Sequence, residues 1–294
     1  MRWKNTLNTA LSRTIGYELR RTDARRRRRR KPNSENVFER LVERPTFVLC
    51  NLRSGSTLLR VLLDSHSRLH SPSEFHFRYV AVKLTKKWGR KAMHELGLDE
   101  RQLEYMLWDR ILDRELAMSR KEHIVCKTPN DVFIVDRLVE CWPDARFIFL
   151  LRHPAASMLS REAFGERVDP VRNLELIRSY CEALERARQT YPGYEIRYED
   201  LTADPEAVLK GVCKYLGVRW EPGMLDYGRF HHGRYRSGVG DFKEKIRTGR
   251  VQPAAPLPAP EDVPEELREF AIAWGYLPPE GAHAEMPAAE PASA

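Results

Sequence analysis

Residues 46–57 read TFVLCNLRSGST, and the fold prediction for the whole chain starts from this stretch. Thr46 to Asn51 is an apolar, β-branched and aromatic run without polar alternation, which is typical of a strand covered on both faces in a parallel sheet. Leu52 to Thr57 then places basic, glycine and hydroxyl residues in one turn. The apolar spacing from Leu58 to His66 predicts a helix, so the loop precedes a helix N-terminus.

Such a loop is suited to holding an anion. Free backbone N–H groups at a helix start favour negative charge, and Gly55 lets a ligand approach the backbone closely. Arg53 adds a guanidinium, and hydroxyl donors come from Ser54, Ser56 and Thr57. The alternative is a tight turn capped by serine, as in many α/β proteins. The loop has no Gly-Lys-Ser/Thr ending, so it matches the ATP- and GTP-binding P-loop poorly.

Composition predicts one large α/β domain in a reducing compartment. The chain has 294 residues, of which 42% are hydrophobic, enough to fill a sizeable core. Five scattered cysteines form no Cys-x-x-Cys pair and are interpreted as small apolar residues. The apolar runs are too short for a membrane span, and no signal-peptide core is evident. We therefore expect a cytoplasmic protein, with peripheral contact at the inner membrane face as an option.

The positive charge is concentrated at the N-terminus. Residues 1–31 hold twelve Lys/Arg against two acids, a balance of +10 within a chain of net charge +8, which leaves −2 for the rest. Trp3, Leu7, Leu11 and Ile15 recur every fourth position, which indicates an amphipathic helix leading into an arginine run. This segment has four possible roles: it could bind an anionic membrane, bind nucleic acid, act as an organellar presequence, or form a solvated linker. Nucleic acid is not favoured.

Alternating strands and helices predict a parallel sheet with helices on both faces, that is, an α/β fold of three layers. The predicted domain boundaries are a basic segment and linker at 1–43, one domain at 44–277, and a disordered Ala/Pro-rich tail at 278–294. Phe75 to Ser119 is predicted to be a helical, aromatic-rich cap that lines an acceptor pocket or belongs to the core. Further strands are predicted at Ser67–Ser71, His123–Cys126, Arg146–Leu151 and Tyr194–Tyr198, and further helices at Asp131–Cys141, Pro170–Thr190, from Pro205 to Gly217, and at Pro264–Tyr276.

Two charged residues follow predicted strands. Ser71-Pro72-Ser73-Glu74 has the residues of a helix capping box, but Glu74 would also lie near the anion loop as a general base. Lys127 ends the third strand, where ligands bind in open α/β sheets, although a surface lysine is the alternative. Thr128, before Pro129, is expected to cap the next helix.

A second candidate anion site follows the fourth strand. Arg152 and Ser160 lie on either side of one strand-to-helix junction. His153 directly precedes Pro154, which favours a capping or packing role over a ligand or base. The Gly- and Arg-rich segment 233–250 either folds over a phosphate or is a surface loop.

Together these motifs resemble the sulfotransferases that use 3′-phosphoadenosine 5′-phosphosulfate (PAPS), in the branch with a glutamate base, from about Arg44 to Gly217. The family's phosphosulfate loop is similar to residues 52–58, and its 3′-phosphate site to Arg152 and Ser160. Lys-Thr-Pro at 127–129 and Tyr-Glu-Asp-Leu at 198–201 are also similar to family signatures. The resemblance implies a P-loop-like fold and PAPS as the donor, without a metal. The implied donor-binding residues are Arg53, Ser54, Gly55, Ser56, Thr57, Leu58, Arg152, Ser160, Tyr198, Arg247, Gly249 and Arg250, the last three by a loose match.

Many members place a catalytic histidine two residues after the strand-three lysine, where this chain has Pro129. The resemblance then implies Glu74 as the base, with Lys127 and Arg53 stabilising charge. The expected function is transfer of a sulfuryl group to a hydroxyl or amine of a carbohydrate, glycolipid or small metabolite. The alternatives are a P-loop small-molecule kinase and a non-enzymatic membrane or nucleic-acid binder. The sequence names neither the acceptor nor the oligomeric state.

Overall fold

The structure is a computed structural model that describes residues 39–163, 169–232 and 244–279. The chain divides into two units at Glu39, and nearly all described residues belong to the second, Arg40–Ala294. The predicted basic amphipathic helix, its proposed membrane contact and the C-terminal tail lie outside the described residues. No helix among the described residues is long and apolar enough to cross a membrane.

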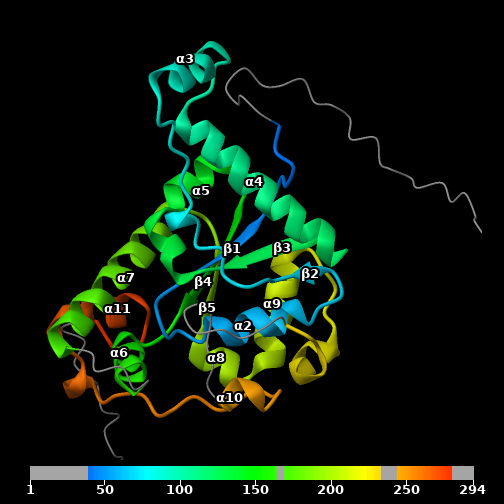
Figure 1. The fold of residues 1–294 in the computed structure, drawn as a ribbon. Helices are drawn as coiled ribbons and strands as arrows, with labels where there is room; N and C mark the ends of the chain where they lie inside the picture. The colour runs from blue at the N-terminus through cyan, green and yellow to red at the C-terminus, as the bar shows by residue number, and fades with distance from the viewer. Residues whose placement is uncertain (1–38, 164–168, 233–243, 280–294) are drawn as a thin grey trace, which may run out of the picture. The chain divides into compact units, whose positions relative to one another are not determined.

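A five-stranded sheet forms the centre of the second unit (Figure 1). The strand order is β2-β3-β1-β4-β5, and every pair is parallel. The bounds are β1 Thr46–Cys50, β2 Leu69–His70, β3 His123–Lys127, β4 Arg146–Leu151 and β5 Tyr194–Arg197. All five strands therefore point the same way, although β2 ends beside Ile124, three residues before the end of β3. This parallel sheet confirms the predicted α/β fold.

Strand β1 is buried along its whole length because helices cover both faces of the sheet. Val48 and Cys50 belong to the core cluster that includes residues of α2, α9 and η3. Phe47 points to the opposite face, where its ring lies 5.5 Å from that of Trp142. This alternation at a period of two explains why the stretch reads as apolar throughout.

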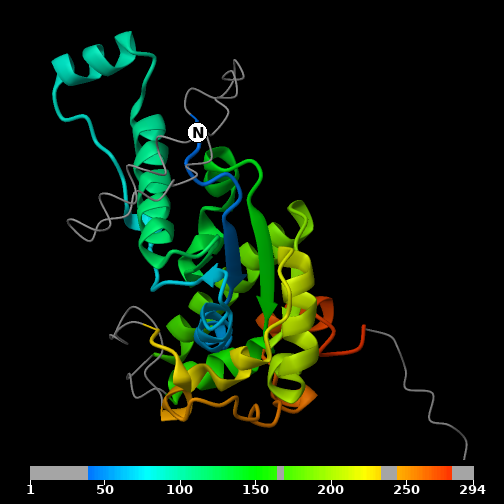
Figure 2. The ribbon, with the colours of Figure 1, turned by 90° about the vertical axis from the view of Figure 1, so that its right-hand side faces the viewer.

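Helices cover both faces, as Figures 1 and 2 show from two sides. The α-helices are α2 Ser56–Asp64, α3 Lys87–Glu95, α4 Glu100–Ser119, α5 Val135–Cys141, α6 Pro154–Glu162, α7 Pro170–Thr190, α8 Tyr198–Ala203, α9 Pro205–Leu216, α10 Glu244–Arg247 and α11 Glu265–Ala273. The 3-10 helices are η1 Phe77–Tyr79, η2 Pro129–Phe133, η3 Pro222–Arg229 and η4 Pro260–Asp262.

Several predicted helix boundaries are confirmed by their caps. The Asp204 side chain accepts a hydrogen bond from the amide of Ala207 at the start of α9, and Gly217 ends that helix with φ 75°. The Asp169 side chain caps α7 in the same way. Pro205 and Pro170 both occupy the first helical turn, where a missing N–H costs nothing.

The segment from Phe75 to Ser119, predicted to be helical, is helical in part. The segment holds only the short η1, then a non-helical stretch, α3 and the long α4. Helix α3 lies far from the sheet in both views (Figures 1 and 2), at the end of a pair of connecting segments. We call residues 80–98 the projecting arm.

Candidate active site

The loop after β1 has two residues with left-handed backbone. Arg53 has φ 59° and Gly55 has φ 78°, and Gly55 is the N-cap residue of α2. A Cβ on Gly55 would lie 2.2 Å from Cδ2 of Tyr198. A glycine is therefore required here by the packed Tyr198 ring and by the left-handed backbone. The sequence alone suggests a different reason, the close approach of a ligand.

The hydroxyl residues of the loop are buried at the start of α2. Four residues of the predicted anion loop are buried: Ser54, Ser56, Thr57 and Leu58. The hydroxyls of Ser54 and Ser56 lie beside the Cys50 thiol, and burial raises the pKa of Cys50 to about 11. The thiol is therefore neutral and acts as a small buried group.

Arg152 joins the two predicted anion sites. Its Nη1 donates a hydrogen bond to the backbone carbonyl of Arg53, and its guanidinium lies 4.6 Å from the centre of the Tyr198 ring. Burial is the main cause that lowers the pKa of Arg152, while Tyr198 and Glu199 act in the opposite direction. Arg152, the loop after β1 and Tyr198 thus form one contiguous group at the carboxyl edge of the sheet.

Helix α6, which follows Arg152 in the chain, carries two serines. Ser160 is half-buried on this helix, but the hydroxyl of Ser157, one turn earlier, is fully buried without a hydrogen-bond partner among the described residues. The predicted capping role of His153 is confirmed, because its side chain accepts from the amide of Ala156. Burial, with Arg152 adding, lowers the pKa of His153, which fits a neutral cap.

Glu74 and Lys127 are in direct contact. Lys127 Nζ donates to Glu74 Oε1, and the side chains are 1% and 8% exposed, respectively. The alternative that residues 71–74 form a capping box is wrong, because no helix begins in this described segment. Ser71 instead donates through its hydroxyl to the carbonyl of Val125 in β3.

Two neighbours complete this pair. His76, with φ 52°, places Nε2 3.1 Å from Glu74 Oε2, so each carboxylate oxygen of Glu74 faces a different nitrogen. Thr128 stands at the N-cap of η2, but its hydroxyl accepts a hydrogen bond from the amide of Phe75. The prediction that Thr128 caps a helix through its side chain is therefore wrong. It helps to fix the segment that carries Glu74.

Asp131 is a further buried carboxyl group near this pair. It is 1% exposed, and neither side-chain oxygen has a hydrogen-bond partner within the described part of the chain. Burial raises the pKa of Asp131 well above its usual range, and the charge of Glu74 adds to this, while Lys127 acts against it. The protonated form of Asp131 is thus favoured in this buried position.

The described end of the Gly- and Arg-rich segment packs on η3. A Cβ on Gly249 would lie 2.8 Å from the Cα of Gly228, and Tyr227 donates through its hydroxyl to the carbonyl of Arg250. Arg247 and Arg250 are exposed. Residues 233–243 lie outside the described residues, so a phosphate contact of this segment stays a prediction.

The site therefore combines cationic side chains with one carboxylate. Arg53 and Arg152 belong to the loops after β1 and β4, and Lys127 ends β3, which lies next to β1 in the sheet. Guanidinium and ammonium groups at parallel strand ends can hold phosphate and sulfate groups. The carboxylate of Glu74 is the group in contact with Lys127 that can take a proton.

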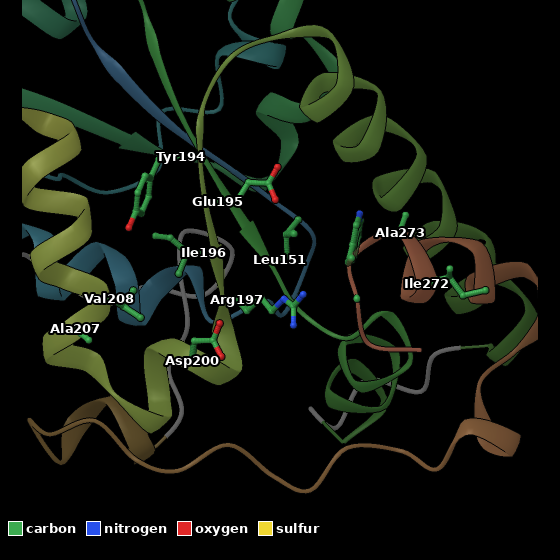
Figure 3. Close-up of a pocket in the computed structure, with 12 residues that line it drawn as sticks. Leu151, Tyr194, Glu195, Ile196, Arg197, Asp200, Ala207, Val208, Ile272 and Ala273 are labelled. Carbon is green, nitrogen blue, oxygen red and sulfur yellow. The ribbon is translucent and has the colours of Figure 1, made fainter. Parts of the chain in front are cut away.

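A separate cavity of about 640 Å³ lies along β5, between α9 and α11 (Figure 3). Its lining includes Arg197, Asp200 and Trp274, but none of the residues that the sequence assigns to catalysis or donor binding. Tyr194 to Arg197 of the strand are seen between Val208 of α9 and Ile272 of α11 in Figure 3. This cavity is therefore distinct from the candidate active site.

Sequence reasoning missed His76 and Asp131. A helix was an open alternative after Ser71, and in a helix residues two apart point to different sides. In the observed non-helical segment, Glu74 and His76 meet. Asp131 was treated only as a helix start, because a sequence does not show which acids lose their contact with water. The spacing Glu-x-His after a short strand was the available signal.

Comparison with known proteins agrees with this geometry. Residues 45–222, more than half of the chain, match a family model described as "Sulfotransferase family". A protein-tyrosine sulfotransferase 1 of Danio rerio is 26% identical over 196 residues, covering 60% of this chain and 53% of that protein. An omega-hydroxy-beta-dihydromenaquinone-9 sulfotransferase of Mycobacterium bovis is 26% identical over 178 residues, covering 51% of this chain and 46% of that protein.

Solved structures share the fold. The sulfotransferase domain of the Synechococcus PCC 7002 olefin synthase superposes with a TM-score of 0.60 at 24% identity, covering 85% of this chain and 99% of that domain.

A further relative was found by sequence. An uncharacterized protein of Aquifex aeolicus is 29% identical over 63% of this chain, but the match spans only 27% of that protein. The match thus spans about half or less of these curated relatives. With the family match over residues 45–222 and the shared fold, the chain belongs to the sulfotransferase family.

Proposed function

We propose that this protein transfers a sulfuryl group from PAPS to a hydroxyl group of an acceptor. The observation that carries the proposal is the convergence of three cations, Arg53, Arg152 and Lys127, with the carboxylate of Glu74 at one edge of a parallel sheet. Family membership supports the reaction class, and the printed names of the relatives describe sulfotransferases.

The residues present fit a donor with two anionic ends. Arg152 has a buried Nε without a hydrogen-bond partner in the described chain, and the hydroxyl of Ser157, in the helix that follows, is equally unpartnered there. Burying such donors costs about 1–3 kcal/mol each unless an acceptor satisfies them. PAPS would supply, when bound, a sulfuryl group on a phosphate that can leave. Arg152, with Ser157 and Ser160 on α6, would hold its 3′-phosphate.

The loop after β1 would hold the opposite end. Arg53, Ser56 and Thr57, with the first amides of α2, supply cationic and neutral donors for the phosphosulfate. Lys127 lies at the end of the neighbouring β3 and stabilises the charge that develops on the leaving oxygen. Tyr198 packs on Gly55 and under Arg152, so it fixes the loop and the guanidinium together.

Glu74 takes the proton of the acceptor. As the acceptor oxygen bonds to sulfur, the bond from sulfur to the phosphate oxygen of the donor would break and that phosphate would leave. The acceptor O–H bond breaks and its proton moves to the carboxylate of Glu74. His76 and Lys127 each hold one oxygen of that carboxylate, which fixes its orientation. The names of two relatives specify a tyrosine and an omega-hydroxy group, and both support a hydroxyl as the acceptor here.

The test is transfer of ³⁵S-labelled sulfate from PAPS to an extract of the source cells, followed by identification of the labelled product. We expect a labelled product that depends on the protein and forms without added Mg²⁺. The absence of labelled product with well-folded protein, in extracts that contain lipids, glycans and proteins, would contradict the proposal.

Binding measurements test the donor side separately. By calorimetry, adenosine 3′,5′-bisphosphate should bind without magnesium in preference to ADP, whereas a small-molecule kinase would show the reverse. Arg152→Gln should weaken the bisphosphate at least about tenfold, the size expected for one charge-assisted pair, and leave 5′-AMP unchanged. Arg146→Gln, at the opposite end of β4, is the matched control. Equal losses in both variants would remove Arg152 from the donor site.

A further inference from the structure

The projecting arm, residues 80–98, exposes an apolar stripe that nothing covers among the described residues. None of the residues of α3 is buried, Trp88 is 77% exposed, and Leu96 is 67% exposed. Trp88, Ala92 and Leu96 are four residues apart, so they share one side of the helix. An isolated apolar residue on a surface is ordinary, but an indole aligned with a leucine on a helix without core contacts indicates a binding surface.

The other side of the arm is strongly basic. Lys87, Arg90 and Lys91 lie off the apolar stripe, and Lys83 and Lys86 lie just before the helix. With Glu95 as the single acid, these five cations give the arm a charge of +4. Helix α3 thus has an exposed apolar stripe, a basic face and no buried residue.

Local bonds hold the arm in place without core packing. The amide of Leu98 donates to the carbonyl of Met93 across Gly97, which has φ 70°, and this closes α3. The amide of Leu84 donates to Glu100 in the first turn of α4, and Asp99 forms a capping box with Gln102 at the same helix start. Both ends of the arm are therefore fixed to α4, and Figures 1 and 2 both show α3 beyond the end of that helix.

We propose that the projecting arm binds the surface of an anionic lipid bilayer. An indole and a leucine insert at the headgroup level, and lysines beside them reach lipid phosphates, so a bilayer uses both faces of the helix. If a second copy of the chain bound through its own arm, two surfaces of charge +4 would meet, and their repulsion disfavours that contact. Nucleic acid would use the cations and leave the apolar stripe in water.

Binding of the full chain to vesicles tests this surface. Sedimentation with phosphatidylcholine vesicles, with and without 30% phosphatidylglycerol, measures partitioning, and light scattering measures the oligomeric state. We expect binding that requires phosphatidylglycerol. Lys87→Glu/Lys91→Glu should weaken it at least about tenfold, because each cation near the surface contributes about 1 kcal/mol. Lys210→Glu/Lys214→Glu, an equally spaced pair on α9, should change it less than about twofold.

Tryptophan quenching by brominated lipids locates the contact. The chain has six tryptophans, and Trp108, Trp142 and Trp274 are buried. We expect Trp88→Phe to remove most of the quenching and Trp3→Phe to leave it. Quenching that follows Trp3, binding that ignores lipid charge, equal effects of the two lysine pairs, or a dimer that depends on Trp88 would each overturn the proposal.

Discussion

Two clusters in this molecule contain the same kinds of residue, but they differ in how many of their polar atoms have hydrogen-bond partners. In the first, Glu74 contacts Lys127 and His76, with Asp131 nearby. In the second, Asp64 at the end of α2 contacts histidines and a lysine as well. The first cluster includes Lys127, the last residue of β3, whereas the second lies at the end of α2, beside the short β2.

The Asp64 cluster is satisfied on all sides. Asp64 accepts from His232 Nδ1 at 2.8 Å and from the amide of Ser71 at 2.9 Å, and Lys121 Nζ lies 3.5 Å away. The other ring nitrogen of His232 faces the carbonyl of Tyr227 at 2.9 Å, so both nitrogens face acceptors. Burial tends to raise the pKa of Asp64, but hydrogen bonds from His232, His70 and Ser71 lower it well below its usual range.

The Glu74 cluster keeps unused capacity. Both oxygens of Asp131 and Nδ1 of His76 are buried without hydrogen-bond partners among the described residues. A structural cluster satisfies its polar groups, whereas a catalytic one keeps groups ready for a substrate. The comparison teaches that the hydrogen bonding of the buried polar atoms, more than the residue types, separates a structural ion cluster from a candidate catalytic one.

The largest expected effect is on stability, at Asp64. Asp64→Asn should reduce the free energy of unfolding by about 3 kcal/mol at pH 7, because it removes a largely buried carboxylate that pairs with Lys121 and bonds His232 and Ser71. Because the folded-state pKa of Asp64 is lowered, its contribution is present above about pH 4 and lost as the pH falls below it. Denaturant unfolding at pH 7 and pH 3 should therefore show a difference that shrinks in acid. A pH-independent difference would contradict the ionic role.

The next effect is on turnover, at Glu74. Glu74→Gln should reduce kcat by ~100-fold or more, about 2.7 kcal/mol, because the amide cannot take a proton. Binding of adenosine 3′,5′-bisphosphate should stay intact. Glu104→Gln is the matched control, since Glu104 is also a buried glutamate paired with a cation, Arg137, outside the candidate site. It should lower stability and leave turnover unchanged. Equal turnover in both variants would return Glu74 to a structural role.

A smaller and opposite effect is expected at Asp131. A raised folded-state pKa means that the folded chain keeps a proton that the unfolded chain releases, so stability falls as the pH rises above about 4. Asp131→Asn removes this cost and should increase the free energy of unfolding by about 1–2 kcal/mol at pH 8, but not at pH 4. Thermal unfolding at both pH values measures it. A loss of stability at pH 8 would show that Asp131 is ionised and paired.

The smallest effect is expected at His76. His76→Ala should reduce kcat by about fivefold to tenfold, roughly 1 kcal/mol, because Glu74 loses one of the two nitrogens that orient it. His76→Gln, which keeps a donor of similar reach, should recover much of the loss. Steady-state kinetics of both variants, with thermal unfolding as a control for folding, decides the role. Equal rates in alanine and glutamine variants would leave His76 a packing residue.

Much of the donor side could be predicted from the sequence because it is set by local chain order. A strand, a polar turn and a helix place Arg53 and Arg152 at strand ends, and parallel pairing then brings those ends together. The caps of α7 and α9 are equally local, since Asp, Pro and Gly act within one turn. The predicted roles of these residues in donor binding stay predictions.

The acceptor side could not be predicted to the same extent, because its contacts join distant segments. Glu74 meets Lys127 across 53 residues, and Thr128 bonds the amide of Phe75 over the same separation. Sequence spacing favoured a capping box there, and tertiary contacts overrode it. In the same way, the sequence predicted a helical cap over 75–119, but not that α3 within it would have no buried residue.

Strand β2 has only two residues, and this has a consequence for how the protein can change. The chain leaves the sheet almost as soon as it enters it, and the next sheet residue is in β3, more than fifty positions later. An insertion or deletion between η1 and α4 would therefore leave the register of all five strands untouched. This family member can therefore vary the segment that carries α3 while the strand ends that carry Arg53, Lys127 and Arg152 keep their geometry.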